Sequence, residues 1–309
     1  MILCVCLSPA IDVTYHVDRL HVGGTTRVGT VTERPGGKAV NVARVLHRLG
    51  ERVHLVAPAG GDTGEELQRG LAATGLAATL VPSGHPTRRT VTVVVEGSAE
   101  ATTLVEPGVL DCWAELLAAV DSALTGAAVL VLSGSVPDGV PPDGLAALVV
   151  KGRRLGLPVL VDTDGPQLLA ALAAGATVVK PNARELATVT REDDPVRAAR
   201  SLAETYDALV VASLGEAGVV VASPHGTWEG RPAAALTGNP TGAGDALVAG
   251  LARALHRDAA QVVTPEQMLH DAVALSAAAV RSPEAGDVDP SEHVAQLHGT
   301  VVRALDGAR

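Results

Sequence analysis

Short, continuous runs of valine and leucine alternate with helix-like segments along most of this chain. Each run ends in small or polar residues, a pattern typical of parallel strands buried on both faces. The predicted strands span residues 2–7, 53–60, 128–134, 158–163, 176–182 and 208–215. Amphipathic helices are predicted between them at 39–50, 64–75, 144–156 and 194–206. This alternation predicts an α/β fold in which helices flank a doubly wound, mostly parallel sheet.

Two segments, residues 12–34 and 87–105, break the alternation. Both are rich in threonine, valine and arginine and alternate with a period of two, which is typical of antiparallel strands with one wet face. No internal repeat or low-complexity linker is evident. We therefore expect a single domain over residues 1–309, with a small β-sheet lid formed by these two segments.

Composition argues against several classes of partner and compartment. The net charge of −10 and the 1% of aromatic residues disfavour nucleic acid, which needs a basic surface and stacking platforms. No apolar run approaches the ~20 residues of a transmembrane helix, so no membrane partner is expected. The first residues lack a basic segment of the kind that begins a signal peptide. Three cysteines, with Cys4 and Cys6 on one strand face, predict buried thiols and a cytoplasmic protein.

Ligands of open α/β sheets bind beyond the carboxyl ends of the strands. The polar residues that follow the predicted strands are therefore the candidates for a site. They are Asp12, Ser133 to Ser135, Asp162, Asp164, Lys180, Asn182, Ser213 and Gly215. Lysine is rare in this chain, since only Lys38, Lys151 and Lys180 occur among 24 basic residues. Arginine therefore supplies most of the surface charge, and a lysine in a glycine- or proline-rich turn is a better candidate for a specific role.

Two glycine-rich turns precede predicted helices. In "RPGGKAVN", Gly36 and Gly37 allow a close backbone approach to a ligand, and Lys38 and Asn41 are spaced to share a helix face. The chain has no GxxxxGK[ST] phosphate loop, and a Gly-Gly turn alone is weak evidence.

The second turn, "TGAGDALVAGLARAL", places Gly242, Ala243 and Gly244 directly before Asp245. An ordinary loop with a charged helix start would also fit this pattern. Free amides of a first helical turn can bind an anion, and we expect Asp245 to lie exposed there, where the helix dipole favours its ionised form. Amides beside an acid suit a phosphoryl transfer in which the acid receives the proton of an attacking alcohol.

The chain resembles the PfkB (ribokinase-like) carbohydrate kinases over essentially its whole length. The resemblance rests on "GGKAVNVARVLHRLGERVHLVAPAG" (36–60) and "NPTGAGDALVAGLA" (239–252). Within the family it is most similar to the 1-phosphofructokinase and tagatose-6-phosphate kinase branch, through "LSPAID", "TRRTVTV", "SGSVPDGVP", "VDTDG", "KPNARE" and "SLGEAG". The branch usually carries asparagine and lysine where this chain has Thr90 and Thr92, and "NSVGAGD" where it has "NPTGAGD".

The resemblance implies a ribokinase-like fold and a role for each matching residue. Asp245 would be the catalytic base, with Gly242, Ala243 and Gly244 as the anion hole. The phosphosugar would be bound by Asp12, Gly37, Lys38, Asn41, Arg88 and Ser135. The nucleotide would be bound by Lys180, Asn182, Ser213, Gly215 and Gly218, and Mg²⁺ by Glu185.

The function implied is transfer of the γ-phosphoryl group of ATP, with Mg²⁺, to a hydroxyl of a phosphorylated ketohexose, first of all fructose 1-phosphate to give fructose 1,6-bisphosphate. Tagatose 6-phosphate and fructose 6-phosphate stay open as substrates, as does an unphosphorylated sugar or nucleoside. Lys38 and Arg88 favour a phosphorylated substrate. A non-catalytic sugar-phosphate-binding protein is the remaining alternative, and Asp245 argues against it. The family also leads us to expect a homodimer that pairs through the lid.

Overall fold

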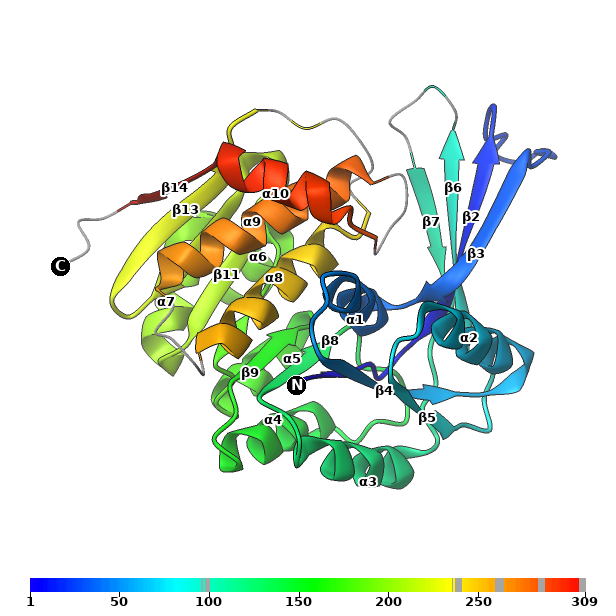
Figure 1. Ribbon diagram of the computed structural model, residues 1–309, viewed down its shortest axis with the longest axis horizontal. Coiled ribbons are helices and arrows are strands. Elements are labelled where there is room, and N and C mark those ends of the chain that lie inside the picture. The colour runs from blue at the N-terminus through cyan, green and yellow to red at the C-terminus, as the bar shows by residue number, and fades with distance from the viewer. Residues whose placement is uncertain are drawn as a thin grey trace.

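A ten-stranded sheet forms the centre of the computed structural model (Figure 1), which describes residues 1–95, 97, 101–234, 236, 241–258, 264–282 and 287–305. The seven adjacent strands at one end of this sheet, including its edge strand, are all parallel, and each predicted valine- and leucine-rich run lies among them. The strands follow in the spatial order β14 (Thr300–Ala304), β13 (Gly226–Pro232), β12 (Val219–Ser223), β11 (Leu209–Ser213), β10 (Val178–Val179), β9 (Val159–Asp162), β8 (Val129–Ser133), β1 (Ile2–Val5), β4 (Val53–Ala59) and β5 (Ala78–Pro82).

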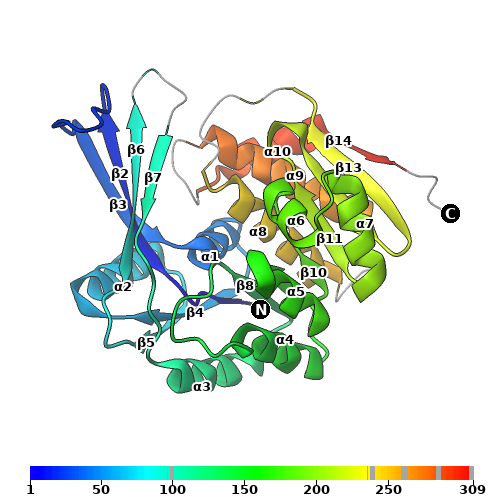
Figure 2. The same ribbon diagram turned by 180° about the vertical axis from the view of Figure 1, so that it is seen from behind.

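Helices cover both faces of this sheet, as the two opposite views show (Figures 1 and 2). One layer contains α1 (Lys38–Arg48), α2 (Gly61–Thr74), α8 (Ala243–Asp258), α9 (Pro265–Arg281) and α10 (Pro290–Gly299). The other contains α3 (Trp113–Leu124), α4 (Gly144–Arg154), α5 (Gly165–Ala173), α6 (Ala183–Thr190) and α7 (Pro195–Tyr206), and a short 3₁₀ turn spans Gly215–Ala217. Strand β1 alternates between the layers, because Cys4 packs into the first core and Leu3 into the second. The doubly wound α/β expectation is confirmed.

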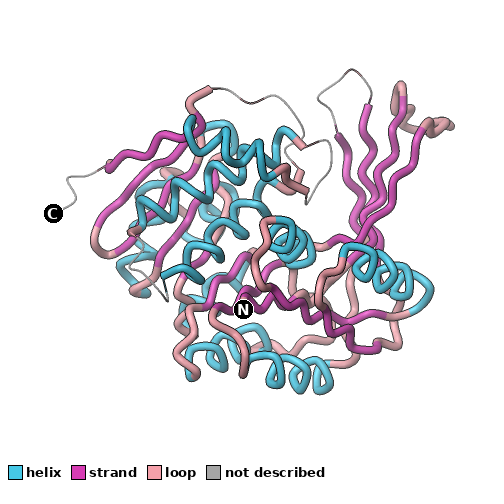
Figure 3. The backbone as a smooth tube through the Cα atoms, in the orientation of Figure 1, coloured by secondary structure: helices cyan, strands magenta, loops and turns pink. Residues whose placement is uncertain are grey.

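A separate four-stranded sheet projects from the body beside α1 and α2 (Figure 3). Its order is β3 (Thr30–Gly36), β2 (Ala10–Val17), β6 (Arg88–Val95) and β7 (Ala101–Val105). These strands come from the two segments expected to form a lid, although residues 96 and 98–100 of the second segment lie outside the described residues. That this small sheet acts as a lid stays a prediction.

The expectation of antiparallel strands in the small sheet is wrong for its central pair. Strands β2 and β6 run parallel, whereas β3 and β7 pair antiparallel with them. The reason is topological, since β2 follows β1 and β6 follows β5, and both leave the same carboxyl edge of the main sheet. Local alternation in the sequence carries no information on this direction.

Strand register divides the small sheet into a polar and an apolar face. Asp12 stands opposite Thr90, and Thr14 opposite Thr92, so these side chains share one face. Val13 stands opposite Val91, and Tyr15 opposite Val93, on the other. Among the described residues, no helix is long and apolar enough to cross a membrane. The three cysteines are free and buried, as the sequence predicts.

Helices α8 and α9 approach closely at Gly250. A Cβ atom built there would lie 2.5 Å from Cα of Ala272 and 3.1 Å from its Cβ. We expect Gly250→Ala to lower the free energy of unfolding by ~1–3 kcal/mol, because overpacking forces the helices apart. Thermal and denaturant unfolding measure this loss.

Gly244→Ala on the same helix is the matched control. The nearest atom to a Cβ built at Gly244 is Nζ of Lys180, at 3.7 Å, which is ordinary contact. This control should match or exceed the parent stability, since alanine is favoured over glycine in helices by up to ~1 kcal/mol. Equal losses in both variants would contradict the close-packing account.

Candidate active site

Charged residues from distant parts of the chain meet at the carboxyl edge of the parallel strands. Asp162 ends β9 and Ser133 ends β8, while Lys180 directly follows β10. Helices α1 and α8 bring Lys38 and Asp245 to the same edge. The structure therefore gathers side chains from five elements at the place where the sequence predicts a site.

Asp162 is the most enclosed carboxylate of this group, at 1% exposure. Its Oδ1 lies 3.2 Å from Nζ of Lys180, its Oδ2 lies 3.5 Å from Nζ of Lys38, and Ser133 donates a 3.0 Å hydrogen bond to Oδ2. Burial acts to raise the pKa of Asp162, but the two ammonium groups and the hydroxyl hold it below its usual range. Asp162 is therefore ionised and paired.

Asp245 is buried, at 8% exposure, although the sequence led us to expect an exposed first turn. Helix α8 begins at Ala243, after Gly242 with a left-handed φ of 85°, so the position in the first turn is as expected. The amide of Asn41, on α1, donates a 2.9 Å hydrogen bond to Oδ2 of Asp245. A tertiary contact across 204 residues covers this carboxylate, and local sequence cannot show it.

The expected preference of Asp245 for its ionised form is also wrong. Burial, and then the nearby charge of Asp162, raise the pKa of Asp245 to about 7, while Asn41, Lys38 and Lys180 act in the opposite direction. Desolvation therefore outweighs the helix dipole at this position. A carboxylate with this pKa exchanges protons near neutral pH, as a general base must.

Asn41 also connects Asp245 to Asp12 on β2. Burial raises the pKa of Asp12, opposed by the charges of Arg88 and Arg44 and by hydrogen bonds from the Gly37 backbone and Asn41. The other amide atom of Asn41, Oδ1, is buried without a hydrogen-bond partner in the structure. An acceptor in this position suits a hydroxyl group between the two carboxylates.

The Gly36–Gly37 turn is needed for this arrangement. A Cβ atom at Gly36 would collide with the carboxylate of Asp12. Gly37 has a φ of 97°, and a Cβ there would lie 3.0 Å from Cα of Pro9. Any other residue at either position would displace Asp12 or the start of α1.

Arg88, and not Arg89, lies on the same face of the small sheet as Asp12. Its guanidinium donates to the backbone oxygens of Glu106 at 3.1 Å and Ser8 at 3.4 Å, and its Nε is buried without a partner. Arg89 lies on the opposite face, 3.9 Å from Glu66. The sequence-based choice of Arg88 as the residue that faces the site agrees with this geometry.

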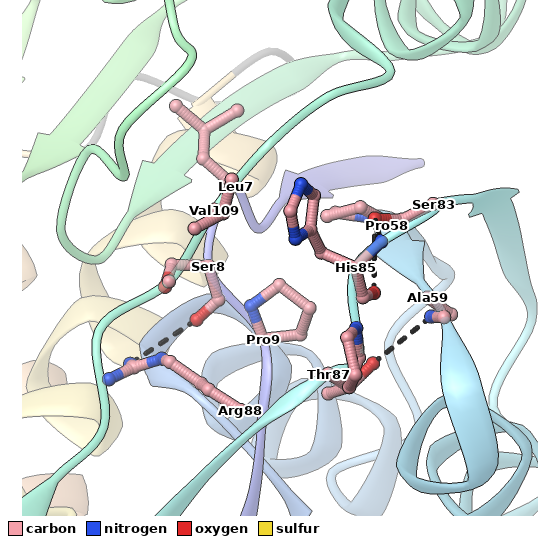
Figure 4. Close-up of a pocket in the computed structure, with 13 residues that line it drawn as sticks. Leu7, Ser8, Pro9, Pro58, Ala59, Ser83, His85, Thr87, Arg88 and Val109 are labelled. Atoms are coloured by element: carbon pink, nitrogen blue, oxygen red, sulfur yellow. Dashed lines mark hydrogen bonds between the residues drawn. The ribbon is translucent and has the colours of Figure 1, made fainter.

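Arg88 also forms part of the wall of a small cavity (Figure 4). The cavity lies where β1, β4 and β5 end, and Ser8, His85 and Thr87 line it. Asp245 is not among its lining residues. Arg88 thus lines this cavity, and its charge also acts on Asp12.

The residues predicted to bind a nucleotide lie further along the same edge. Asn182 caps the start of α6 through two reciprocal hydrogen bonds of 2.9 Å. The backbone amide of Glu185 donates to the Asn182 side chain, and the backbone amide of Asn182 donates to the Glu185 carboxylate. Asn182 also forms an isolated bridge with Ser213. The chain then turns through Gly215 and Gly218, with φ values of 62° and 97°. Ser135 is exposed just beyond β8.

A magnesium ion fits this edge only as a partly hydrated ion. Among the described residues, no group of three or more His, Cys, Asp or Glu side chains could hold a metal. Mg²⁺ bound with nucleotide phosphates usually takes one or two carboxylates and keeps several waters. Glu185, whose charge acts to raise the pKa of Lys38, could supply the one carboxylate that such an ion needs.

Comparison with known proteins shows the family of this chain. The family model described as pfkB family carbohydrate kinase matches residues 1–292. The chain belongs to this family. It is 33% identical to the 1-phosphofructokinase of Xanthomonas campestris pv. campestris over 300 residues, covering 93% of each chain. It is 32% identical to the ATP-dependent 6-phosphofructokinase isozyme 2 of Escherichia coli over 283 residues, covering 88% of this chain and 90% of the relative.

Solved structures give the same fold. Phosphofructokinase-2 from Escherichia coli in complex with fructose-6-phosphate superposes with a TM-score of 0.86 at 30% identity, over 96% of this kinase and 98% of the other chain. A tetrameric inhibited form of the same enzyme has also been solved, with a TM-score of 0.85 at 30% identity over the same shares. The ribokinase-like fold and the expected family are thereby confirmed. Relatives of both phosphofructokinase types match about equally well.

Sequence reasoning left Asp162 and Ser133 out of the selected site residues of this kinase. In the sequence, both stand out only as polar residues after predicted strands. Burial of a carboxylate next to two lysines is visible only in three dimensions. The rarity of lysine was the one available signal, because two of the three lysines converge on Asp162.

The raised pKa of Asp245 makes a prediction about stability. Its ordinary value is 3.8, so between about pH 4 and 7 the folded state binds more protons than the unfolded state, and stability falls as pH rises through that window. Asp245→Asn removes this penalty and keeps a carbonyl for Asn41. Relative to the parent, the variant should gain on the order of 3 kcal/mol in free energy of unfolding between pH 4.5 and pH 8. Denaturant titrations at both pH values measure it, and an equal difference at both would contradict the raised pKa.

Proposed function

We propose that this kinase transfers the γ-phosphoryl group of ATP to a hydroxyl of a phosphorylated ketohexose, with fructose 1-phosphate as the first candidate. Asp245 carries this proposal. It is a buried carboxylate whose pKa burial raises to about 7, and it lies in the first turn of α8, where the backbone amides have no partner within the helix. In this reading Asp245 accepts the proton of the attacking hydroxyl as its oxygen bonds to the γ-phosphorus, while the bond from that phosphorus to the bridging oxygen breaks and ADP leaves.

Positive charge on both sides supports phosphoryl transfer at this place. Lys180 lies against Gly244, and Lys38 shares the Asp162 carboxylate with it. Charge on a transferring phosphoryl group is spread over its oxygens, so fixed amides and ammonium groups stabilise it. Glu185 would hold Mg²⁺, which would offset the charge of the nucleotide phosphates.

The sugar would lie between Asp12, Asn41 and Asp245. Carboxylates and an unpartnered amide oxygen are acceptors for sugar hydroxyls. The charge of Arg88 acts on Asp12, so the two side chains lie near each other. We therefore assign Arg88 to binding a phosphate at the far end of the substrate. We assign the backbone of Gly37 to close contact with the sugar. We assign Ser135 to the sugar phosphate that Arg88 would bind.

Nucleotide binding is assigned to the strand ends at β10 and β11. This part of the edge contains Lys180, Asn182, Ser213, Gly215 and Gly218, and it is separated in the sheet order from β1 and β5, which lead into the small sheet. Glycines with positive φ leave room for a flat base or a phosphate to approach the backbone.

Fructose 6-phosphate is the second candidate substrate, because one relative is an ATP-dependent 6-phosphofructokinase and one similar solved structure is a complex with fructose-6-phosphate. A coupled assay of ADP release separates the candidates. It should compare fructose 1-phosphate, fructose 6-phosphate, tagatose 6-phosphate and the free sugars. A clear preference for any phosphohexose supports the proposal. Equal use of phosphorylated and free sugars would reject it. If no sugar or sugar phosphate supported ADP release, a non-catalytic binding protein would be favoured.

We also propose a homodimer that pairs through the small sheet. Val31 and Leu104 are exposed, at 52% and 60%, and the register places both on the apolar face with Val13. Exposed apolar side chains on a projecting sheet favour a partner surface.

Loss of the carboxylate at position 245 tests the assignment of the base. Asp245→Asn should fold, because its amide can keep the contact with Asn41, and should lower kcat by ~10²–10⁴-fold. The coupled assay at pH 8 measures the loss, with binding of the phosphohexose followed by calorimetry. A folded variant that retained more than a third of the parent rate would exclude Asp245 as base.

The two adjacent lid arginines provide a matched test of phosphate recognition. Arg88→Ala should raise the KM for the phosphohexose by ~10–150-fold, since a charge-assisted hydrogen bond is worth ~1.5–3 kcal/mol. The KM for ATP should hardly change. Arg89→Ala removes the same charge from the opposite face and should have a much smaller effect. Similar KM values in both variants would mean that only the overall charge of the small sheet matters.

A further inference from the structure

Two of the three lysines in the chain meet at one carboxylate. The sequence has 24 basic residues, and all except Lys38, Lys151 and Lys180 are arginines. Lys38 and Lys180 both contact Asp162, whereas Lys151 pairs with Asp121 on the surface at 2.8 Å. Lysine carries a compact, strongly hydrated charge, unlike the broad guanidinium of arginine. Its use at this point in an arginine-rich chain indicates a requirement for a small cation.

The two ammonium groups reach Asp162 from different sides. Lys180 is almost enclosed, with 6% of its side chain exposed, and its Nζ lies 3.7 Å from where Gly244 would carry a Cβ. Lys38 is 42% exposed and reaches in from the start of α1. Asp162 itself is 1% exposed at the end of β9. One lysine therefore borders the anion-binding turn, and the other borders the sugar side.

Electrostatics explains why a carboxylate must stand between them. Two ammonium groups at this edge would repel each other, and a buried lysine without a partner tends to lose its proton. The paired oxygens of Asp162 attract both, and Ser133 fixes the carboxylate from the strand next to it. The set of three carries one net positive charge next to the turn at residues 242–244.

We propose that Asp162 is a positioning residue, whose two oxygens hold the ammonium groups of Lys38 and Lys180 on either side of the phosphoryl group in transfer. This role rests on the proposed kinase function. Asp162 does not touch the substrate. It acts through the two lysines, and misplacing such groups by ~1 Å can cost ~10²-fold in rate.

Asp162 has a second effect, on the base. The charged and hydrogen-bonding groups that face Asp245 are Asp162 from β9, Lys38 and Asn41 from α1, and Lys180 after β10. Asp162 is the one that raises the pKa of Asp245, and the other three lower it. Removal of the Asp162 charge should therefore move the acid limb of the rate profile to lower pH.

Asp162→Asn tests both effects with little change in shape. We expect kcat to fall by ~30–300-fold, the KM values for ATP and phosphohexose to stay within about threefold, and the acid limb of kcat/KM to move down by at least about half a pH unit. Asp164→Asn, an exposed carboxylate two residues away at the start of α5, is the control and should behave like the parent. A merely structural role for Asp162 would not shift the pH limb.

Lysine spectra give a readout that is independent of turnover. With lysine labelled at ¹³Cε, the protein should show three signals. Asp162→Asn should move the signals of Lys38 and Lys180 and leave that of Lys151 in place, and Asp164→Asn should move none. If the parent fails on every sugar phosphate, the proposed function falls, and the spectra still test whether Asp162 holds the lysines.

Ser133→Ala provides a second variant should Asp162→Asn fail to fold. It removes only the hydroxyl that orients Asp162, and it should lower kcat by ~5–30-fold while moving the same two lysine signals. The proposal is overturned if a folded variant keeps kcat within threefold of the parent with the acid limb in place. It is equally overturned if the signals of Lys38 and Lys180 do not move.

Discussion

Burial of the parallel strands on both faces is the constraint from which the site follows. Six adjacent parallel strands, from β11 to β4, consist largely of buried apolar residues and pack between helices on each side, so the charged side chains of the site lie at the strand ends. At the carboxyl edge, Asp162 and Asp245 are nevertheless buried. Asp162 is kept ionised by two lysines, while Asp245 is left with a pKa near neutrality. The same enclosure thus gives one carboxylate a positioning role and the other the ability to exchange a proton.

The sequence predicted the parts of this arrangement that depend on local pattern. Strand and helix positions followed from runs of valine and leucine, and the alternation of side chains separated Arg88 from Arg89. Glycine turns before α1 and α8 predicted where backbone and ligand would approach each other. The strands β12 to β14, which extend the sheet antiparallel, were not predicted, although the segment around Pro224 and His225 carries a turn signal between two strand-like runs.

The errors concern contacts between residues that are far apart in the chain. Asp245 was expected to be exposed and ionised because its neighbours suggest an open helix start. Helix α1 brings Asn41 over this carboxylate and helps to bury it. Burial and the repulsive charge of Asp162 on β9 raise its pKa, although the hydrogen bond from Asn41 opposes that rise. The parallel pairing of β2 and β6 has the same origin, since it depends on where each strand leaves the main sheet. Asp162 could have been suspected only from the rarity of lysine.

The central claim is that a sugar hydroxyl is held between Asp245 and the phosphoryl group that it attacks. A crystal structure with fructose 1-phosphate and a non-hydrolysable ATP analogue tests this most directly. The account predicts a hydroxyl within ~2.6–3.2 Å of a carboxylate oxygen of Asp245, with the terminal phosphate of the analogue against the turn at 242–244 and Lys180. A bound phosphosugar whose hydroxyls all lie beyond reach of Asp245, with the terminal phosphate away from that turn, would contradict it.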